Sequence, residues 1–350
     1  INQGKQDKHI IGSNNYIDGK SYLTISKEKA QELINQYAGK GQLEFSDSGK
    51  WNKKEIITVK ETIGVVKNKN NEIIVWSPFE EEYEELSKLH THKKIFNDYS
   101  FKDLNFSMNL EETINDAQVV ILAVPSNAIR EVLNKTKKLL NNQILIFVSK
   151  GLEENTLKRS SEIAKDLEIN NRYAVLAGPT FAKDMLNDIP LGFTLATESK
   201  EVVEVAEKMF DNTKVNLEVS NDIVGVEYAG CVKNVLAIIA GYFYAKEKAS
   251  SARAMFFTKI AKEEANLLAV LGGSSKTLYT YAGLGDLLLT ATSNESRNFS
   301  YGEALANNLI TDKSTTVEGK KTYKSLLTLI PKERLTDSLL VTYAYLFEEN

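Results

Sequence analysis

The sequence predicts an α/β chain in which an incomplete, doubly wound parallel sheet is followed by an all-helical domain and preceded by a small α+β segment. Short apolar runs alternate with helical patterns from Asn71 to about Val219, which is typical of a parallel sheet joined by helices. Beyond this region the helical patterns are broken only by glycine-rich turns, whereas the first part of the chain has turn residues between short strand patterns. We therefore expect three segments, residues 1–70, 71–219 and 220–350.

The first segment contains strand patterns and one helical pattern. The run IIGSNNYIDGKSYLTIS predicts a strand between turns, because Gly and Asn punctuate it. A helix is expected from Ser26, which can cap it, to just before Gly39, with Glu28 in its first turn. The run KEIITVKETIGVV predicts strand pieces that end in a polar turn. Together these patterns indicate a small α+β unit.

Five apolar runs in the middle of the chain predict the strands of the parallel sheet. They are residues 72–76, 117–126, 143–151, 173–179 and 192–197. The run AQVVILAVPS is apolar almost throughout, as expected of a strand buried on both faces of a sheet. Helical patterns such as SPFEEEYEELSKLH and NAIREVLNKTKKLL lie between these runs and supply the connections.

Composition narrows the class of protein. The chain has 350 residues, of which 42% are hydrophobic and 26% charged, as in an ordinary globular protein with two or three domains. Its net charge of −4 argues against a general nucleic-acid binder. The single cysteine, Cys231, excludes an internal disulfide and suits a reducing compartment, so we expect a cytoplasmic protein. Apolar runs without a charge are too short for a membrane span, and three histidines are too few for a convincing metal site.

A lysine at the centre of an apolar helical run is the most unusual residue of the last segment. Lys233 lies within IVGVEYAGCVKNVLAIIAGY, and mostly small residues share its helical face. They are Val226, Ala229, Gly230, Ala237 and Ala240. A buried lysine without a partner is costly or has a lowered pKa. Two interpretations follow: a lysine whose stem packs while its ammonium reaches water, or a functional ammonium that a ligand approaches.

The ends of three predicted strands carry residues suited to ligand binding. One strand ends in AVPS, Lys150 follows the next, and Gly178 and Thr180 follow the third. Ligands bind outside the carboxyl ends of strands in an open parallel sheet. At this edge Lys150 provides a cation, Gly178 permits close backbone approach and Thr180 offers a hydroxyl group. Each motif alone is weak, because Gly and Pro at strand ends are usually turns, but together with Lys233 they are stronger.

The run AGLGDLLLTATSNESRN adds a second group of polar residues in the helical segment. Its two glycines predict a tight bend before Asp286, which could cap the next helix or orient a ligand. Ser296, Arg297 and Asn298 form a compact cluster of donors. The planar fork of an arginine suits phosphate, whereas the alternative is a solvated surface arginine.

Several motifs in one order resemble bacterial NAD(P)-dependent glycerol-3-phosphate dehydrogenase from about residue 71 to the end. They are AVPS, SKGLE, AGPTFAKDM, VGVEYAGCVKNVLAIIAG, SSARAMFFTK, AGLGDLLLTATSNESRNFSYG and TTVEG, and VWSPFEEE is similar to the family's second-strand region. The resemblance implies a Rossmann-like sheet domain and reversible oxidation of sn-glycerol 3-phosphate to dihydroxyacetone phosphate, which supplies glycerol 3-phosphate for phospholipid synthesis. It implies NAD or NADP as cofactor and no nucleic-acid partner for residues 71–350, and it leaves a homodimer open.

The resemblance also implies roles for individual residues. Lys233, in the motif VKN, matches the general acid/base that handles the proton of the C2 hydroxyl group. The residues implied in substrate binding are Lys150, Gly178, Thr180, Lys233, Asp286, Ser296, Arg297 and Asn298. The residues implied in cofactor binding are Trp76, Lys150, Ala182, Arg297, Val317 and Glu318.

The family's first strand, glycine-rich turn and helix, which hold the cofactor pyrophosphate, have no counterpart in this sequence. We therefore expect a sheet without its central strand and a chain that does not bind NAD(P)H usefully. Thr62–Val66 could enter the gap, but its short link to Glu72–Trp76 leaves room only for an antiparallel hairpin. Acidic residues follow Trp76 in place of the arginine of NADP-preferring members, which weakens the case for NADP over NAD.

Residues 1–70 resemble instead the polymorphic toxin type 50 domain, on the runs KHIIGSNNYIDGKSYLTIS and AQELINQYAGKG. This gives an alternative function, a toxin or nucleic-acid-acting module with the remainder a passive remnant. The dehydrogenase-like part keeps its whole substrate constellation while the toxin-like part is truncated, so the first function is favoured. Because the chain begins with Ile1 rather than methionine, we expect it to be a piece of a longer reading frame.

Overall fold

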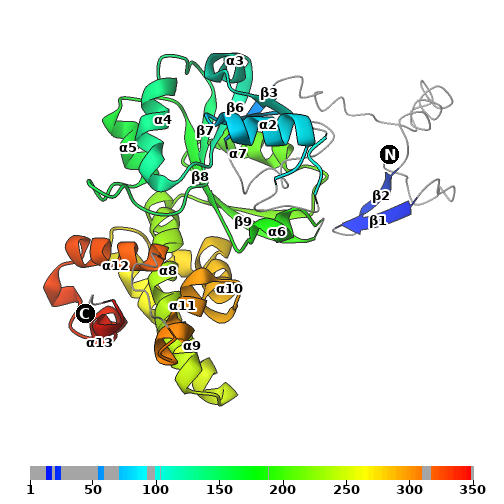
Figure 1. The fold of residues 1–350 in the computed structure, drawn as a ribbon. Helices are drawn as coiled ribbons and strands as arrows, with labels where there is room; N and C mark the ends of the chain where they lie inside the picture. Colours follow the sequence, from blue (N-terminus) through cyan, green and yellow to red (C-terminus); the bar gives the residue numbers. More distant parts are fainter. Residues whose placement is uncertain are drawn as a thin grey trace. The chain divides into compact units, whose positions relative to one another are not determined.

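The computed structural model describes residues 13–17, 20–24, 54–58, 71–92, 99–102, 104–187, 189–309 and 317–347. The chain forms two compact units, Ile1–Asn52 and Lys53–Asn350, which are coloured along the sequence in Figure 1. In the first unit, β1 (Ser13–Ile17) and β2 (Lys20–Thr24) form an antiparallel pair. The sequence predicts one strand here and the structure has two. The helix predicted from Ser26 lies outside the described residues.

The second unit is built on a sheet of eight strands in the order β10-β9-β8-β7-β6-β3-β4-β5. Its strands are β3 (Lys54–Thr58), β4 (Glu72–Trp76), β5 (Asn105–Ser107), β6 (Ala117–Leu122), β7 (Ile144–Phe147), β8 (Tyr173–Ala177), β9 (Leu191–Ala196) and β10 (Val215–Ser220). Neighbouring strands from β5 to β8 are parallel. All four residues of β7 are buried, as expected of a strand with helices on both sides.

Strand β3 occupies the centre of this sheet, between β4 and β6 and parallel to both. Ile57 lies opposite Val75 on one side and Ile121 on the other. The expectation of a sheet without its central strand is therefore wrong. The strand comes from the segment that the sequence assigned to the α+β unit.

Two properties of the sequence allow this insertion. The run EIIT is rich in β-branched residues, which favour strands. The stretch from Val59 to Asn71 is also long enough for a parallel crossover, which takes about a dozen residues. Thr62–Val66, the segment predicted to enter the gap, lies outside the described residues.

The far edge of the sheet departs from the predicted parallel arrangement. β9 runs antiparallel to β8, and β10 is parallel to β9. Among the described residues between β8 and β9, the one helix is the one-turn α6 (Ala182–Met185). Without a longer crossover helix, consecutive strands pair more readily in opposite directions.

Short amphipathic helices flank the sheet (Figure 1). They are α2 (Glu80–Leu89), α3 (Leu110–Asn115), η1 (Ser126–Ala128), α4 (Ile129–Thr136), α5 (Ser160–Asp166) and α7 (Lys200–Met209). Their buried apolar residues join those of the strands in one core, which includes Ile129 and Leu133 of α4 packed with Leu145 and Phe147 of β7. This core fixes the loops at the carboxyl ends of the strands.

The helical half is arranged around α8 (Ile223–Lys246), most of which is buried. The other elements are α9 (Ser250–Val270), η2 (Ser275–Tyr279), η3 (Tyr281–Gly285), α10 (Asp286–Thr292), α11 (Arg297–Ala306), α12 (Glu318–Leu329), η4 (Lys332–Arg334), α13 (Leu339–Thr342) and η5 (Ala344–Leu346). Helices α8 and α11 cross so closely that a Cβ at Gly302 would lie 2.0 Å from the carbonyl oxygen of Ile238.

Among the described residues, α8 is the one helix with the length and hydropathy of a membrane span. However, 89% of its apolar window is buried inside the protein. Residues of α9, α11 and α12 pack around it in a single apolar cluster. Helix α8 is therefore the core helix of this half, and it carries Lys233 into the interior.

Candidate active site

A cluster of two lysines and one aspartate links the sheet to the helical half. Lys233 Nζ lies 2.5 Å from Asp286 Oδ1, and Lys150 Nζ lies 2.9 Å from Asp286 Oδ2. Lys233 is 5% exposed and Asp286 is fully buried, whereas Lys150 is partly exposed. The ammonium of Lys233 thus meets a buried carboxylate rather than bulk water.

The charges of this cluster change one another's protonation. Burial lowers the pKa of Lys233 to about 8, a shift that Asp286 opposes and Lys150 reinforces. Burial alone would raise the pKa of Asp286, but the ammonium groups of Lys150 and Lys233 together hold that pKa below its usual value. Asp286 therefore stays charged while Lys233 can gain or lose a proton near neutral pH, as a general acid or base must.

Glycines let three separate segments meet at this cluster. Gly178 follows β8, and a Cβ there would lie 2.2 Å from the carbonyl oxygen of Gly192 in β9. Its own carbonyl oxygen is 3.5 Å from Lys150 Nζ. Asp286 begins α10 directly after η3, a turn in which a Cβ at Gly283 would lie 2.3 Å from the carbonyl oxygen of Thr277. In place of the tight bend that the sequence predicts before Asp286, the structure has a helical turn, η3, that continues directly into α10.

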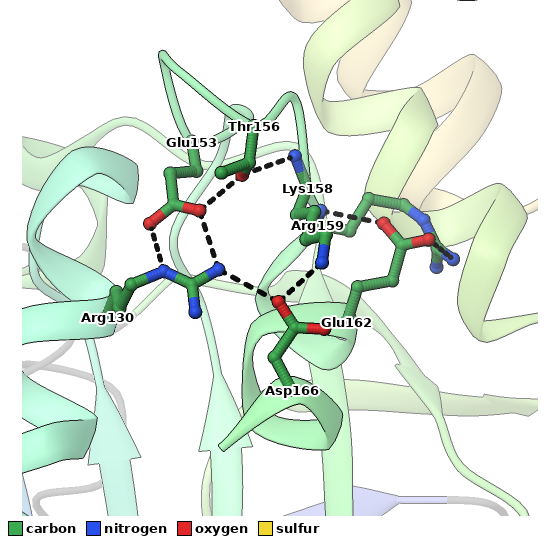
Figure 2. A network of polar contacts seen from close by, with 7 residues as sticks. All are labelled: Arg130, Glu153, Thr156, Lys158, Arg159, Glu162 and Asp166. Carbon is green, nitrogen blue, oxygen red and sulfur yellow. Dashed lines mark hydrogen bonds and ion pairs between the residues drawn. The ribbon is translucent and has the colours of Figure 1, made fainter.

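A polar network anchors the loop that follows Lys150 (Figure 2). Arg130 of α4 forms a two-pronged pair with Glu153, at 2.7 and 2.8 Å, and its Nη2 also lies 3.1 Å from Asp166 Oδ2 in α5. Lys158 pairs with the same oxygen of Asp166 at 2.5 Å. Hydrogen bonding from Arg130 also lowers the pKa of Glu153, against the effect of burial. The loop is thus fixed to two helices, which restricts the backbone beside Lys150.

A cavity of about 700 Å³ opens at the carboxyl ends of β4, β6, β7 and β8. Three predicted substrate residues line it, namely Lys150, Gly178 and Thr180, together with the predicted cofactor residues Trp76 and Glu318. Most of the other lining residues are apolar, as is usual in pockets for small molecules and cofactors. Through Lys150 and its ion pair with Asp286, the inner end of this cavity connects to Lys233.

Two residues predicted to bind the cofactor, Trp76 and Glu318, lie on the wall of this cavity. The ring of Trp76 lines one part, with its Nε1 donating a hydrogen bond to the carbonyl oxygen of Met108 at 3.1 Å. Close to Glu318, Gly151 has φ +121°, and a Cβ there would lie 2.9 Å from Ser126 Oγ and 3.1 Å from Glu318 Oε1, so only glycine fits at this position. A segment between β3 and β4 would have to hold the pyrophosphate, and residues 59–70 lie outside the described part of the chain.

Three predicted cofactor residues lie at helix starts. Val317 precedes the first turn of α12 in an extended conformation, and Glu318 is the first residue of that helix. Ala182 is the first residue of α6, and its side chain is outside the described part of the structure. Glu318 lies on the wall of the cavity at the carboxyl ends of the strands.

The donor cluster at the start of α11 is split between structural and exposed positions. Ser296 caps α11 by accepting a hydrogen bond from the backbone N–H of Phe299. Asn298 is buried, donates to Asn234 Oδ1 of α8 at 3.0 Å and accepts from the N–H of Gly319 at 3.0 Å. Arg297 is exposed and has no polar partner among the described residues. Its guanidinium is therefore available to a ligand.

Comparison with known proteins gives matches along most of the chain. Residues 62–203 match the model for the NAD-dependent glycerol-3-phosphate dehydrogenase N-terminus, and residues 222–349 match that for its C-terminus. A glycerol-3-phosphate dehydrogenase from Clostridium botulinum is 34% identical over 250 residues, which cover 69% of this chain and 75% of the relative. The chain belongs to the NAD-dependent glycerol-3-phosphate dehydrogenase family.

Other matches agree with this family and with the fold. A glycerol-3-phosphate dehydrogenase from Fusobacterium nucleatum is 34% identical over 270 residues, 75% of this chain and 80% of the relative. The crystal structure of glycerol-3-phosphate dehydrogenase from Coxiella burnetii matches with a TM-score of 0.70 at 26% identity, covering 79% of this chain and 89% of that chain. Residues 1–78 match a model described as Bacterial toxin 50. Strand β3 of the dehydrogenase sheet therefore lies in the toxin-like segment.

Two buried residues beside the cluster were missed in the sequence. Asn234 follows Lys233 directly and anchors Asn298 across the helix crossing. Glu264 of α9 is fully buried and contributes to the electrostatics of Lys233 and Asp286. It could have been found because Ile260 and Leu268, one helical turn away on each side, are apolar, so a carboxyl group lies in an apolar stripe.

Proposed function

We propose that the site of the dehydrogenase unit is built for the reversible NAD(P)-dependent oxidation of sn-glycerol 3-phosphate to dihydroxyacetone phosphate, and that this chain lacks the glycine-rich turn that would hold the cofactor for turnover. The observation that carries the proposal is the Lys150–Asp286–Lys233 cluster, whose Lys150 lies on the cavity wall. It combines a fixed negative charge, a cation on the cavity wall and a lysine with a pKa of about 8. Family membership supports the class of reaction, and this cluster supplies a group that can exchange the proton of that reaction.

The oxidation removes a hydride from C2 of the substrate and a proton from the C2 hydroxyl group. The cofactor, when bound, accepts the hydride. Lys233 in its neutral form accepts the proton and becomes an ammonium, which Asp286 stabilises. In the reverse direction the same ammonium returns the proton to the developing hydroxyl group. Lys150 orients the substrate from the cavity wall and, through its own charge, keeps the pKa of Lys233 low.

The remaining residues serve to bind substrate and cofactor in this proposal. Thr180 and Arg297 offer a hydroxyl and a guanidinium group to the substrate, and the fork of Arg297 suits its phosphate. Trp76 and Glu318 lie on the wall that would hold NAD or NADP. We further propose that the reaction supplies glycerol 3-phosphate for phospholipid synthesis in the cytoplasm.

The alternative proposal places the function of the chain in residues 1–70. The match of residues 1–78 to the toxin model favours a toxin or nucleic-acid-acting module there. On that alternative the dehydrogenase unit would be a remnant without turnover. The two proposals are separated by measuring dehydrogenase activity and cofactor binding.

The chain as it stands is expected to bind NADH only weakly, without saturable binding at low micromolar concentration. The reason is the segment between β3 and β4, which contains a single glycine, Gly64. A pyrophosphate normally sits on backbone N–H groups of a glycine-rich turn that opens a helix. Titration of the full chain with NADH, followed by nucleotide fluorescence, measures this. Saturation at low micromolar Kd would mean that residues 59–70 hold the pyrophosphate in another way.

The matched comparison is a restored chimera, in which residues 54–70 are exchanged for the first strand, glycine-rich turn and helix of a family member. We expect it to bind NADH at low micromolar Kd and to oxidise glycerol 3-phosphate. A chimera that is folded and binds NADH, yet shows no turnover with glycerol 3-phosphate, would contradict the proposed function.

In the restored chimera, Arg297→Lys is expected to raise KM for glycerol 3-phosphate by about tenfold, because lysine keeps the charge but loses the two-pronged fork. Its Tm should hardly change, since Arg297 is exposed and has no described partner. Steady-state kinetics and thermal unfolding measure the two effects. Arg334→Lys, at another exposed arginine, should change neither quantity. A lower Tm with unchanged KM would instead make Arg297 a structural residue.

A further inference from the structure

Glu264 is the one described residue whose two side-chain carboxyl oxygens are both buried without a hydrogen-bond partner. Its exposure is 0%. It lies on the face of α9 that packs against α8, because Leu268, one turn further on, belongs to the same apolar cluster as Ala229 of α8. A buried polar group without a partner costs stability, so a purely structural role does not explain this carboxyl group.

The groups that act on Glu264 are those of the proposed active site. Asp286 of α10 and Lys233 of α8 are the two charged groups that influence it. Lys233 in turn faces Asp286 and Lys150. Together, the two ammonium groups and the single carboxylate of Asp286 carry a net charge of plus one, with Lys233 and Asp286 buried and Lys150 partly exposed. Ionisation of Glu264 would neutralise this excess, and protonation of Glu264 would leave it in place.

We propose that Glu264 is a positioning residue for Lys233: its buried, unpartnered carboxyl group sets, through its own charge, how firmly Lys233 holds its proton. When Glu264 is protonated, the excess positive charge favours the neutral amine of Lys233. When Glu264 is ionised, its negative charge favours the ammonium. The catalytic consequence rests on the proposed function, but the electrostatic coupling does not.

The directions in which the pKa values of Glu264 and Lys233 are shifted agree with this role. Burial raises the pKa of Glu264 to about 8, with Asp286 adding to the shift and Lys233 opposing it. Burial lowers the pKa of Lys233 to about the same value. Two interacting groups that titrate in one pH range release their protons as a coupled pair. The charge of Glu264 therefore changes in the pH range in which Lys233 must exchange a proton.

The test uses the full chain and needs no turnover. The titration of Lys233 is followed by nitrogen NMR of its side-chain amine, assigned with Lys233→Met. In Glu264→Gln the midpoint should fall by about one pH unit, because an amide cannot become negative. Glu264→Met, which also removes the unpartnered polar atoms, should give the same fall if the glutamine variant folds poorly. An unchanged midpoint in both variants would overturn the proposal.

Glu263→Gln is the matched control. Glu263 is the adjacent residue of α9 and is also buried, but its carboxylate accepts hydrogen bonds from Ser338 and from the backbone N–H of Leu339. Lys233 is not among the groups that act on it. This variant should leave the Lys233 midpoint unchanged. An equal fall in the control would show a general loosening of α9 and would also overturn the proposal.

Folding stability gives a second readout. The folded-state pKa of Glu264 is raised from 4.5 to about 8, so between these values the folded chain binds more protons than the unfolded chain. Stability from this group is therefore lost as pH rises through that window. The urea midpoint of the wild-type chain should fall more from about pH 5 to about pH 8 than that of Glu264→Gln. Parallel pH dependences would contradict a protonated Glu264.

The restored chimera separates the inference from the proposed function. If the chimera turns over, Glu264→Gln should move the acidic limb of kcat/KM for glycerol 3-phosphate oxidation to lower pH by the shift seen for Lys233. A Lys233 shift in a chimera without turnover would support the coupling and contradict the dehydrogenase function. Turnover with an unshifted limb would contradict the coupling and support the function.

Discussion

Lys233→Met is expected to lower kcat of the restored chimera at least about 100-fold, because methionine fills the space of the stem but cannot exchange a proton. The variant should remain folded. Asp286 keeps its ion pair with Lys150, at 2.9 Å, so no buried charge is left without a partner. Steady-state kinetics with glycerol 3-phosphate and thermal unfolding measure the two effects separately.

The control for this variant is Lys332→Met, at an exposed lysine of η4. It should keep the kcat of the parent chimera. If Lys233→Met also kept most of the parent kcat, Lys233 would serve only to neutralise Asp286, and another group would have to take the proton. A large loss of Tm alone would point to the same structural role.

The sequence was most informative where a residue type contradicts its local pattern. Lys233 is a cation in an apolar helix, and the structure pairs it with a buried carboxylate instead of leaving its ammonium in water. Lys150 and Gly178 follow separate strands, and the structure brings them within 3.5 Å because parallel strands end at one edge of the sheet. Their roles in binding remain predictions, but their meeting could be anticipated from topology alone.

Other features depended on contacts that the sequence does not encode locally. Ser296 and Asn298 looked like one donor cluster with Arg297, but the first caps α11 and the second joins α8 to α12. Adjacent residues of a helix start point in different directions, so nearness in sequence did not imply a common ligand. Glu264 was missed because its complete burial depends on how α9 packs against the rest of the helical half.

The central strand shows the same limit at the level of topology. The run KEIIT was predicted as a strand, but its partners could not be read from the run itself. An apolar, β-branched strand is compatible with any sheet that has a free position. The family's usual first strand is absent from the sequence, so two flanking strands would otherwise be unpaired. Strand β3 pairs with both of these flanking strands, so that Ile56 lies opposite Ile74 of β4 and Val120 of β6.

Removal of β3 is therefore expected to abolish folding of the dehydrogenase unit. A chain that begins at residue 53 keeps the whole second unit and should remain monodisperse, with the Tm of that unit unchanged. A chain that begins at residue 60 lacks β3 and exposes the backbone N–H and C=O groups of both flanking strands, which favours aggregation. Size-exclusion chromatography with light scattering and thermal unfolding distinguish the two.

A single substitution gives a finer test of the same strand. Ile56→Pro removes an N–H from a strand paired on both sides, whereas Tyr22→Pro acts in the β1–β2 pair of the other unit. Only the first should lower the Tm of the dehydrogenase unit. A monodisperse chain from residue 60 with an unchanged Tm would show that the sheet does not need the strand drawn from the toxin-like segment.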